Sequence, residues 1–209
     1  MRSNNATGTH DGGTFIEQAR RAQIIEAAIE TVAELGYARA SLAEIARRAG
    51  ISKGVISYHF AGKDELTEQV VLELYTRAGA GIGDRVDSAE SAAAALRGYV
   101  EANLDFIAGH PEQVRVLVDI FMNFRHPDGS PHIDADGQDG LLGHLGSLLH
   151  QGQEAGEFRE FAVRPMAIVI RSAIDAASGQ LALDPAFDVR AYAAELVATL
   201  ERATRKDQP

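Results

Sequence analysis

The segment 52–63 concentrates side chains that donate hydrogen bonds. Lys53 can donate to O6 or N7 of guanine or to a phosphate, and Val55 can contact a thymine methyl group. Tyr58 and His59 carry short, stiff donors that suit phosphate oxygens, whereas Gly54 permits close backbone approach. These residue types indicate contact with double-stranded nucleic acid. The full candidate set is Ser41, Ser52, Lys53, Gly54, Val55, Ser57, Tyr58, His59 and Lys63.

Two short helices must position these side chains. Ser41 and Glu44 form a capping-box pattern, in which each side chain is expected to bond the other residue's amide, so a helix begins near Leu42. Gly50 supplies the positive φ that ends this helix, and Ser52 can cap a second helix that continues to Tyr58. Both serines can also leave helix-terminal amides available to a phosphate. The pattern predicts a helix-turn-helix, although many all-α proteins contain a helical hairpin of this kind.

Residues 15–75 resemble the N-terminal DNA-binding domain of the TetR (tetracycline repressor) family of bacterial transcription regulators. The resemblance rests on the order of five motifs: Glu34-Leu35-Gly36-Tyr37, Ser41 to Gly50, Ser52-Lys53-Gly54-Val55, Tyr58-His59-Phe60 and Lys63-Asp64-Glu65-Leu66. It implies an all-α chain in which a three-helix domain is followed by a helix that links to a ligand-binding and dimerisation body. It further implies a homodimeric repressor that binds a palindromic operator and is released by a small molecule.

One position departs from the family pattern. The family often has a tyrosine two residues before the histidine, and this chain has Ser57 there with Tyr58 next. Tyr58 and His59 have an alternative role as partly buried packing groups against the first helix. The alternative function for the whole hairpin is protein binding. The chain would then be a helical protein-interaction module without specific DNA binding.

The charge is distributed unevenly along the chain. The 209 residues carry a formal net charge of −10. Residues 15–63 hold seven Lys and Arg against five Glu, and residues 64–209 hold twelve basic against twenty-four acidic residues. A mildly positive head on an acidic body favours DNA binding at the head. We therefore expect a disordered tail over 1–14, a helix-turn-helix domain over 15–62 and a helical effector and dimerisation domain over 63–209.

The body pattern predicts helices and no strands. A linking helix is expected from Lys63 to Gly79 or Gly83, and Pro111 is expected to open a helix at its first turn. The other expected helices are 88–108, 141–155, 165–179 and 185–204, with a loop over 126–140.

The last two expected helices carry wide apolar stripes, which predict a four-helix interface with a second copy. The expected interface residues are Met166, Val169, Ile170, Ala173, Ile174, Tyr192, Leu196, Val197 and Leu200. Intramolecular core is expected to cover part of each stripe.

The middle helices are expected, from the resemblance, to enclose a pocket for an unknown small hydrophobic effector. Its expected lining is Asn103, Leu104, Ile107, Val118, Asp119, Phe121, Met122, Arg125, His126, His144, Leu145, Leu148 and Leu149. Plain core packing is the alternative role for each apolar member.

Other classes of protein fit the sequence poorly. The histidines lack the i, i+4 spacing of a metal site, and a calcium loop starting at Asp134 fails because its sixth and twelfth positions are Asp139 and Leu145. The chain has no cysteine and no nucleophile elbow, P-loop or dinucleotide fingerprint, so neither an enzyme nor a cofactor is expected. No apolar stretch suggests a membrane span, and the absence of cysteine suits the cytoplasm.

Overall fold

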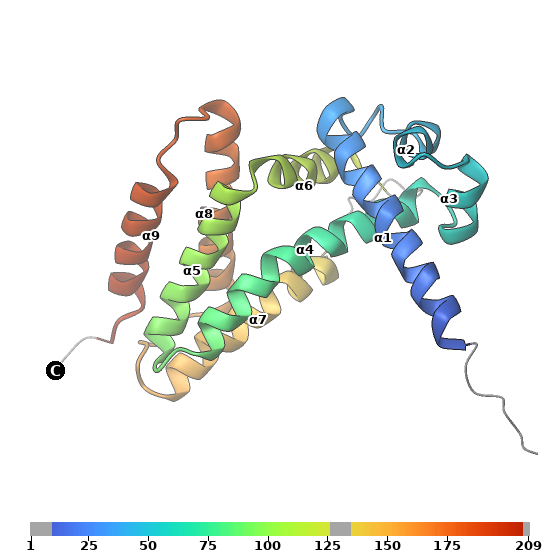
Figure 1. Cartoon of the computed structure of the whole chain (residues 1–209). Helices are drawn as coiled ribbons and strands as arrows, with labels where there is room; N and C mark the ends of the chain where they lie inside the picture. Colours follow the sequence, from blue (N-terminus) through green and yellow to red (C-terminus); the bar gives the residue numbers. More distant parts are fainter. Residues whose placement is uncertain (1–9, 126–134, 207–209) are drawn as a thin grey trace, which may run out of the picture. The chain divides into compact units, whose positions relative to one another are not determined.

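The structure is a computed structural model that describes the backbone of residues 10–125 and 135–206, and side chains over 15–125 and 142–206. Within these ranges the chain is all helical, as predicted, apart from turns and an isolated bridge between Phe158 and Arg205. The helices are α1 (His10–Leu35), α2 (Leu42–Ala49), α3 (Lys53–His59), α4 (Lys63–Asp87), α5 (Ala92–Gly109), α6 (Pro111–Asn123), α7 (Ala135–Glu154), α8 (Val163–Leu183) and α9 (Val189–Thr204) (Figure 1).

The chain divides into two compact units, Met1–Glu73 and Leu74–Pro209, and the division falls inside α4. In the first unit α1 packs on α2, which in turn contacts α3. The core of this unit includes the fully buried side chains of Ile24, Ile56 and Phe60. The expected boundary at residue 62 thus lies at the start of α4, whereas the compact unit continues into that helix.

The predicted helix caps are confirmed for both short helices. The Ser41 Oγ accepts from the Glu44 amide at 3.2 Å, and the Ser52 Oγ accepts from the Val55 amide at 3.4 Å. Gly50 ends α2 with a φ of 66°. The reciprocal half of the capping box is wrong, because the Ser41 amide donates to the Arg39 carbonyl at 2.8 Å. The Glu44 carboxylate instead accepts from Arg47, and that hydrogen bond lowers the pKa of Glu44.

In the second unit α5 contacts α6, α7, α8 and α9 (Figure 1). Its inward side chains meet those of α7, α8 and α9 in one apolar cluster. The fully buried members of this cluster are Val100, Leu145, Leu149, Ile170, Ile174 and Ala177.

Several predicted helix limits are wrong. Gly79, Gly81 and Gly83 do not end α4, which continues to Asp87. A glycine inside a helix costs about 1 kcal/mol relative to alanine without breaking it, and Ile82 and Val86 of the last turns pack on the core cluster. Helix α7 begins at Ala135, inside the predicted loop 126–140, and α1 begins at His10, inside the predicted disordered tail 1–14. Residues 1–9 and 126–134 lie outside the described part of the chain.

Tyr75 lies in a polar region of the second unit. Its ring centroid is 6.2 Å from that of Phe121, and burial raises its pKa to about 12, against a smaller opposing effect of the Arg171 charge. Arg171 itself donates to the Asn103 Oδ1 at 2.8 Å and to the Asp175 carboxylate at 2.5 Å.

The raised pKa of Tyr75 predicts a loss of stability at alkaline pH. Between pH 10 and the folded pKa of about 12 the unfolded chain releases the phenol proton and the folded chain keeps it, so the free energy of unfolding falls as pH rises. From pH 10 to 11 we expect the wild type to lose on the order of 1 kcal/mol more than Tyr75→Phe. Urea unfolding at both pH values measures this difference, and parallel losses in the two proteins would contradict it.

One described helix, α8, is long and apolar enough to cross a membrane by length and composition alone, contrary to the prediction that no stretch would be. The core helix of a soluble protein meets the same test. Ile170, Ile174 and Ala177 of α8 are fully buried in the core cluster, so one side of this helix packs inside the unit.

Candidate nucleic-acid interface

Helix α3 has one inward and one outward face. Ile56 and the capping residue Phe60 are buried in the core of the first unit. Lys53, Gly54, Ser57 and Tyr58 are exposed, and their i, i+1, i+4 and i+5 spacing places them on the same side of the helix. Val55 and His59 are half-buried at the edges of this face. We call the exposed residues Lys53, Gly54, Ser57 and Tyr58 the α3 face.

The C-terminal end of α3 is held by Arg21 of α1. The Arg21 guanidinium donates to the carbonyl of His59 and lies 4.2 Å from the centre of the Phe60 ring. It also lies 3.7 Å from the Glu65 carboxylate of α4. Arg21 therefore connects α1, α3 and α4, and it fixes the orientation of the α3 face. The sequence carries no local signal of this role, because Arg21 and His59 are 38 residues apart.

Lys53 and Tyr58 are the most available donors on the α3 face. Tyr58 is 76% exposed, and its hydroxyl makes one long contact, 3.5 Å to Glu17. Lys53 is exposed and has no hydrogen-bond or ion-pair partner among the residues that the structure describes. The partial burial considered for Tyr58 does not occur. His59 is half-buried, and its ring lies edge-on to Tyr58 with centroids 5.0 Å apart.

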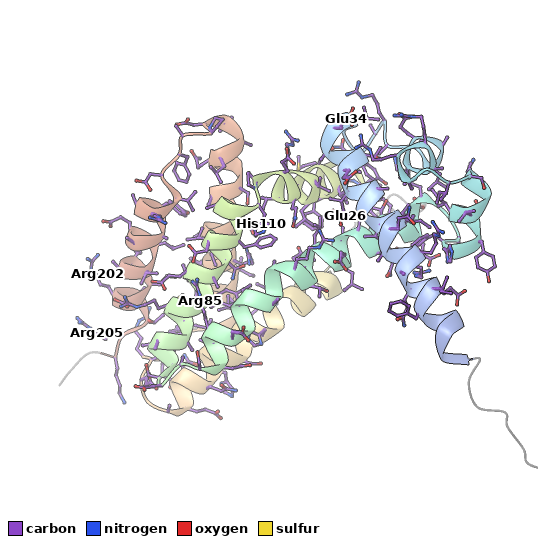
Figure 2. All side chains as sticks on the ribbon, in the orientation of Figure 1. Glu26, Glu34, Arg85, His110, Arg202 and Arg205 are labelled. Carbon is purple, nitrogen blue, oxygen red and sulfur yellow. The ribbon has the colours of Figure 1, made fainter. Side chains whose placement is uncertain are left out.

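Two further cations of this unit, both on α2, are paired within the protein. Arg47 bonds Glu44, and Arg48 pairs with Glu30 and Glu34 of α1 (Figure 2 labels Glu34). These pairs reduce the positive charge that α2 presents. Lys53 is the cation that the α3 face itself presents to an anion.

Lys63 is positioned differently from the other candidates. Its ammonium donates to the Tyr37 carbonyl at 2.7 Å and lies 4.1 Å from the centre of the Tyr37 ring. This joins the start of α4 to the turn after α1. Lys63 thus makes a bridging contact in addition to the phosphate contact predicted from the sequence.

The helices of the first unit match a known protein family. Residues 24–70 match the family described as "Bacterial regulatory proteins, tetR family". Residues 24–70 therefore carry the N-terminal domain of the TetR family. This is a family of DNA-binding transcriptional regulators and not of enzymes, as expected.

A curated relative is the HTH-type transcriptional regulator BetI 1 of Chromohalobacter salexigens, which is 36% identical over 91 residues. The match covers 43% of this chain and 45% of that protein, so it spans about half the length of the relative.

Solved structures extend the likeness to the whole TetR fold. A bacterial regulatory protein of the tetR family from Rhodococcus RHA1 has a TM-score of 0.71 at 25% identity, with 90% of this chain and 98% of that one covered. The transcriptional regulator FadR from Bacillus subtilis, solved in complex with stearoyl-CoA, has a TM-score of 0.74 at 22% identity, with 86% and 96% covered. The second likeness shows the fold alone.

Five of the residues predicted for the dimer interface lie instead in the protein's own core, because α8 and α9 pack on α5. They are Ile170, Ile174, Leu196, Val197 and Leu200. Val169 is 59% exposed, and Met166, Ala173 and Tyr192 are half-buried. The sequence could not separate these groups, since apolar stripes wider than one face leave open which side turns inward.

The predicted pocket residues differ in their burial. Leu104, Ile107, Leu145, Leu148 and Leu149 belong to the core cluster, whereas Val118 and Met122 are 43% and 69% exposed. Asn103 is buried and bonded to Arg171, Arg125 donates to the Phe121 and Phe124 carbonyls, and Asp119 accepts from Asn123. His144 is exposed, and His126 lies outside the described residues.

The structure shows a cleft elsewhere in the second unit, with a volume of about 370 Å³. It lies between α5 and α9 and shares no residue with the predicted pocket. The residues with described side chains contain no cluster of His, Cys, Asp and Glu that could hold a metal ion.

Proposed function

We propose that this TetR-family chain is a repressor that inserts the α3 face into the major groove of a palindromic DNA operator. The supporting observation is that Lys53, Gly54, Ser57 and Tyr58 share one exposed face while Ile56 and Phe60 hold the opposite face in the core. A helix anchored in this way can enter the major groove without rearranging its domain.

Each residue near the groove has a distinct role in this proposal. Lys53 reads a guanine or holds a phosphate, and half-buried Val55 contacts a thymine methyl group where it emerges. Ser57, Tyr58 and His59 donate to phosphates, and Ser41 and Ser52 cap the helices that approach the backbone. Lys63 holds a phosphate alongside its hydrogen bond to the Tyr37 carbonyl, because an ammonium has three donors. The acidic body discourages non-specific binding.

Gly54 provides the most direct test of this role for α3. A Cβ at Gly54 would meet only the Ser52 Oγ, at the ordinary contact distance of 3.6 Å, so Gly54→Ala fits the free protein. Alanine should raise the free energy of unfolding by up to about 1 kcal/mol through helix propensity. If the backbone at Gly54 approaches DNA closely, the same methyl group should lower DNA affinity about tenfold or more.

The matched control for this test is Gly79→Ala in α4. A Cβ there meets nothing within 4 Å, so it supplies the same propensity gain outside the α3 face. Fluorescence anisotropy should show lower affinity for Gly54→Ala alone. The DNA in this measurement is an operator selected by the wild type from a random duplex library. Equal DNA affinity in the two variants would reject close approach of α3 to DNA.

A homodimer is the natural form for this function. One seven-residue recognition helix reads only a few base pairs, and two copies can read half-sites about 34–36 Å apart. The exposed side of α8, which includes Val169 and Leu183, offers apolar area for a second copy. The partners in this proposal are therefore operator DNA and a second copy of the chain, in the cytoplasm, with no membrane, metal or cofactor.

A small-molecule effector completes the proposal. Helix α4 belongs partly to each compact unit, so a ligand that favours one arrangement of the second unit can act on α4 and hence on the first unit. A coupling of about 1–3 kcal/mol would lower operator affinity roughly 5- to 150-fold. The Bacillus subtilis FadR structure was solved in complex with stearoyl-CoA, and this favours a hydrophobic effector for the present chain.

A further inference from the structure

The cleft between α5 and α9 has an apolar floor. It is lined by Leu96 and Val100 of α5 and by Phe158, which lies between α7 and α8. Each of these side chains is at most 3% exposed. Val197 and Leu200 of α9 complete the floor. The volume of about 370 Å³ lies at the lower end of the range of small-molecule sites. At roughly 30 Å³ for each water-sized group, it holds about a dozen non-hydrogen atoms.

The acidic groups around this cleft are already engaged. The two oxygens of the Glu157 carboxylate accept from the amides of Ala92 and Ala93 at 3.0 and 3.2 Å, at the start of α5. The Glu201 carboxylate accepts from the Arg97 guanidinium across the cleft. The Glu201 charge is therefore paired with Arg97, whereas Glu157 keeps its negative charge with both oxygens bound to backbone amides.

Two guanidinium groups remain available at the same cleft. Arg202 lies in the last turn of α9 and Arg205 directly follows that helix (Figure 2). Both line the cleft and both are exposed. Over the described ranges, neither side chain has a hydrogen-bond or ion-pair partner. The cleft thus combines an apolar floor with three arginines against two carboxylates, an excess of one positive charge.

We infer that this cleft binds a small amphipathic carboxylate, with its apolar tail on the floor and its carboxylate at Arg202 and Arg205. Guanidinium groups bind carboxylates through two parallel hydrogen bonds, and the pairing strengthens as the ligand excludes water. The site shares no residue with the effector pocket expected from the sequence. The inference also does not depend on DNA binding, because the test measures ligand binding directly.

Decanoate is a suitable probe because it has about the size of the cleft, and 1-decanol is its uncharged counterpart. Isothermal titration calorimetry of the full chain should show decanoate binding at least tenfold tighter than decanol. Arg202→Gln combined with Arg205→Gln should weaken decanoate binding about tenfold or more and change decanol binding less than twofold. Arg190→Gln removes a charge from the exposed start of α9 and should leave both affinities unchanged.

A second variant tests the place of binding. Ala198 of α9 lines the cleft and is half-buried, so Ala198→Phe should fill the space and abolish binding of both probes. Undiminished decanoate binding in Ala198→Phe, or in the double glutamine variant, would overturn the inference. An equal loss of decanoate and decanol in the double glutamine variant would also overturn it, since the guanidinium groups would then not recognise the carboxylate.

Discussion

Replacing Lys53 and Tyr58 together with alanine is expected to lower operator affinity about a hundredfold or more while the protein stays folded. A base-edge contact of Lys53 is worth about 1–3 kcal/mol, a phosphate contact of Tyr58 adds to it, and a dimer would lose both contacts twice. Both side chains are exposed and Tyr58 makes one weak contact within the protein, so the free energy of unfolding should change by less than about 0.5 kcal/mol. Electrophoretic mobility shift with the selected operator measures the affinity, and urea unfolding measures the stability.

The control for this prediction is Arg190→Ala, which removes a positive charge from α9. It should leave operator affinity nearly unchanged, whereas the double variant should also bind with a shallower dependence on salt. Equal weakening by Arg190→Ala would mean that overall charge governs binding. Unaltered binding by the folded double variant would remove α3 from the interface.

Gly152→Ala is expected to destabilise the second unit by about 3 kcal/mol or more, a large part of the 5–15 kcal/mol typical of a folded protein. Gly152 lies in α7, and a Cβ there would stand 2.2 Å from the Phe158 ring and 2.9 Å from the Ala92 Cβ. The ring is 3% exposed, so it has little space to move away. The Gly152 carbonyl also accepts from the amides of Glu157 and Phe158 at 3.0 Å, which fixes this turn against α7.

Gly143→Ala is the matched control for this substitution. Gly143 is an exposed glycine of the same helix, and a Cβ there would meet nothing within 4 Å, so alanine should add up to about 1 kcal/mol of stability. Phe158→Leu in the Gly152→Ala background should recover part of the loss by opening space. Urea unfolding of the three variants decides the matter, and similar stabilities of Gly152→Ala and Gly143→Ala would contradict the predicted clash.

The helix-turn-helix was predictable from the sequence because its signals are local. Ser41, Gly50 and Ser52 act on amides and backbone angles within a few residues, and all three cap their helices as expected. The family resemblance indicated that Lys53 and Tyr58 face outward, and both are exposed. The bridging contacts of Arg21 and Lys63 join residues far apart in the sequence, and no local pattern revealed them.

The second unit was less predictable because burial there depends on the third dimension. Ile170 and Val169 are neighbours in one apolar run, and only the packing of α8 on α5 makes the first buried and the second exposed. The glycines of α4 were interpreted as breakers although exposed helix positions tolerate them at modest cost. The α5–α9 cleft combines residues separated by a hundred positions, including the pair Arg97 and Glu201, so no spacing in the sequence predicted it.

The central claim is that the chain binds a specific DNA sequence as a dimer, and selection from a random duplex library tests it most directly. Purified wild type and the Lys53→Ala/Tyr58→Ala variant would be carried through parallel selections over a salt series. We predict that the wild type enriches a palindrome with half-site centres about 10–10.5 base pairs apart, or a multiple of this spacing, and that the variant does not. No enrichment by the wild type even at low salt, or the same enrichment by both proteins, would contradict the claim.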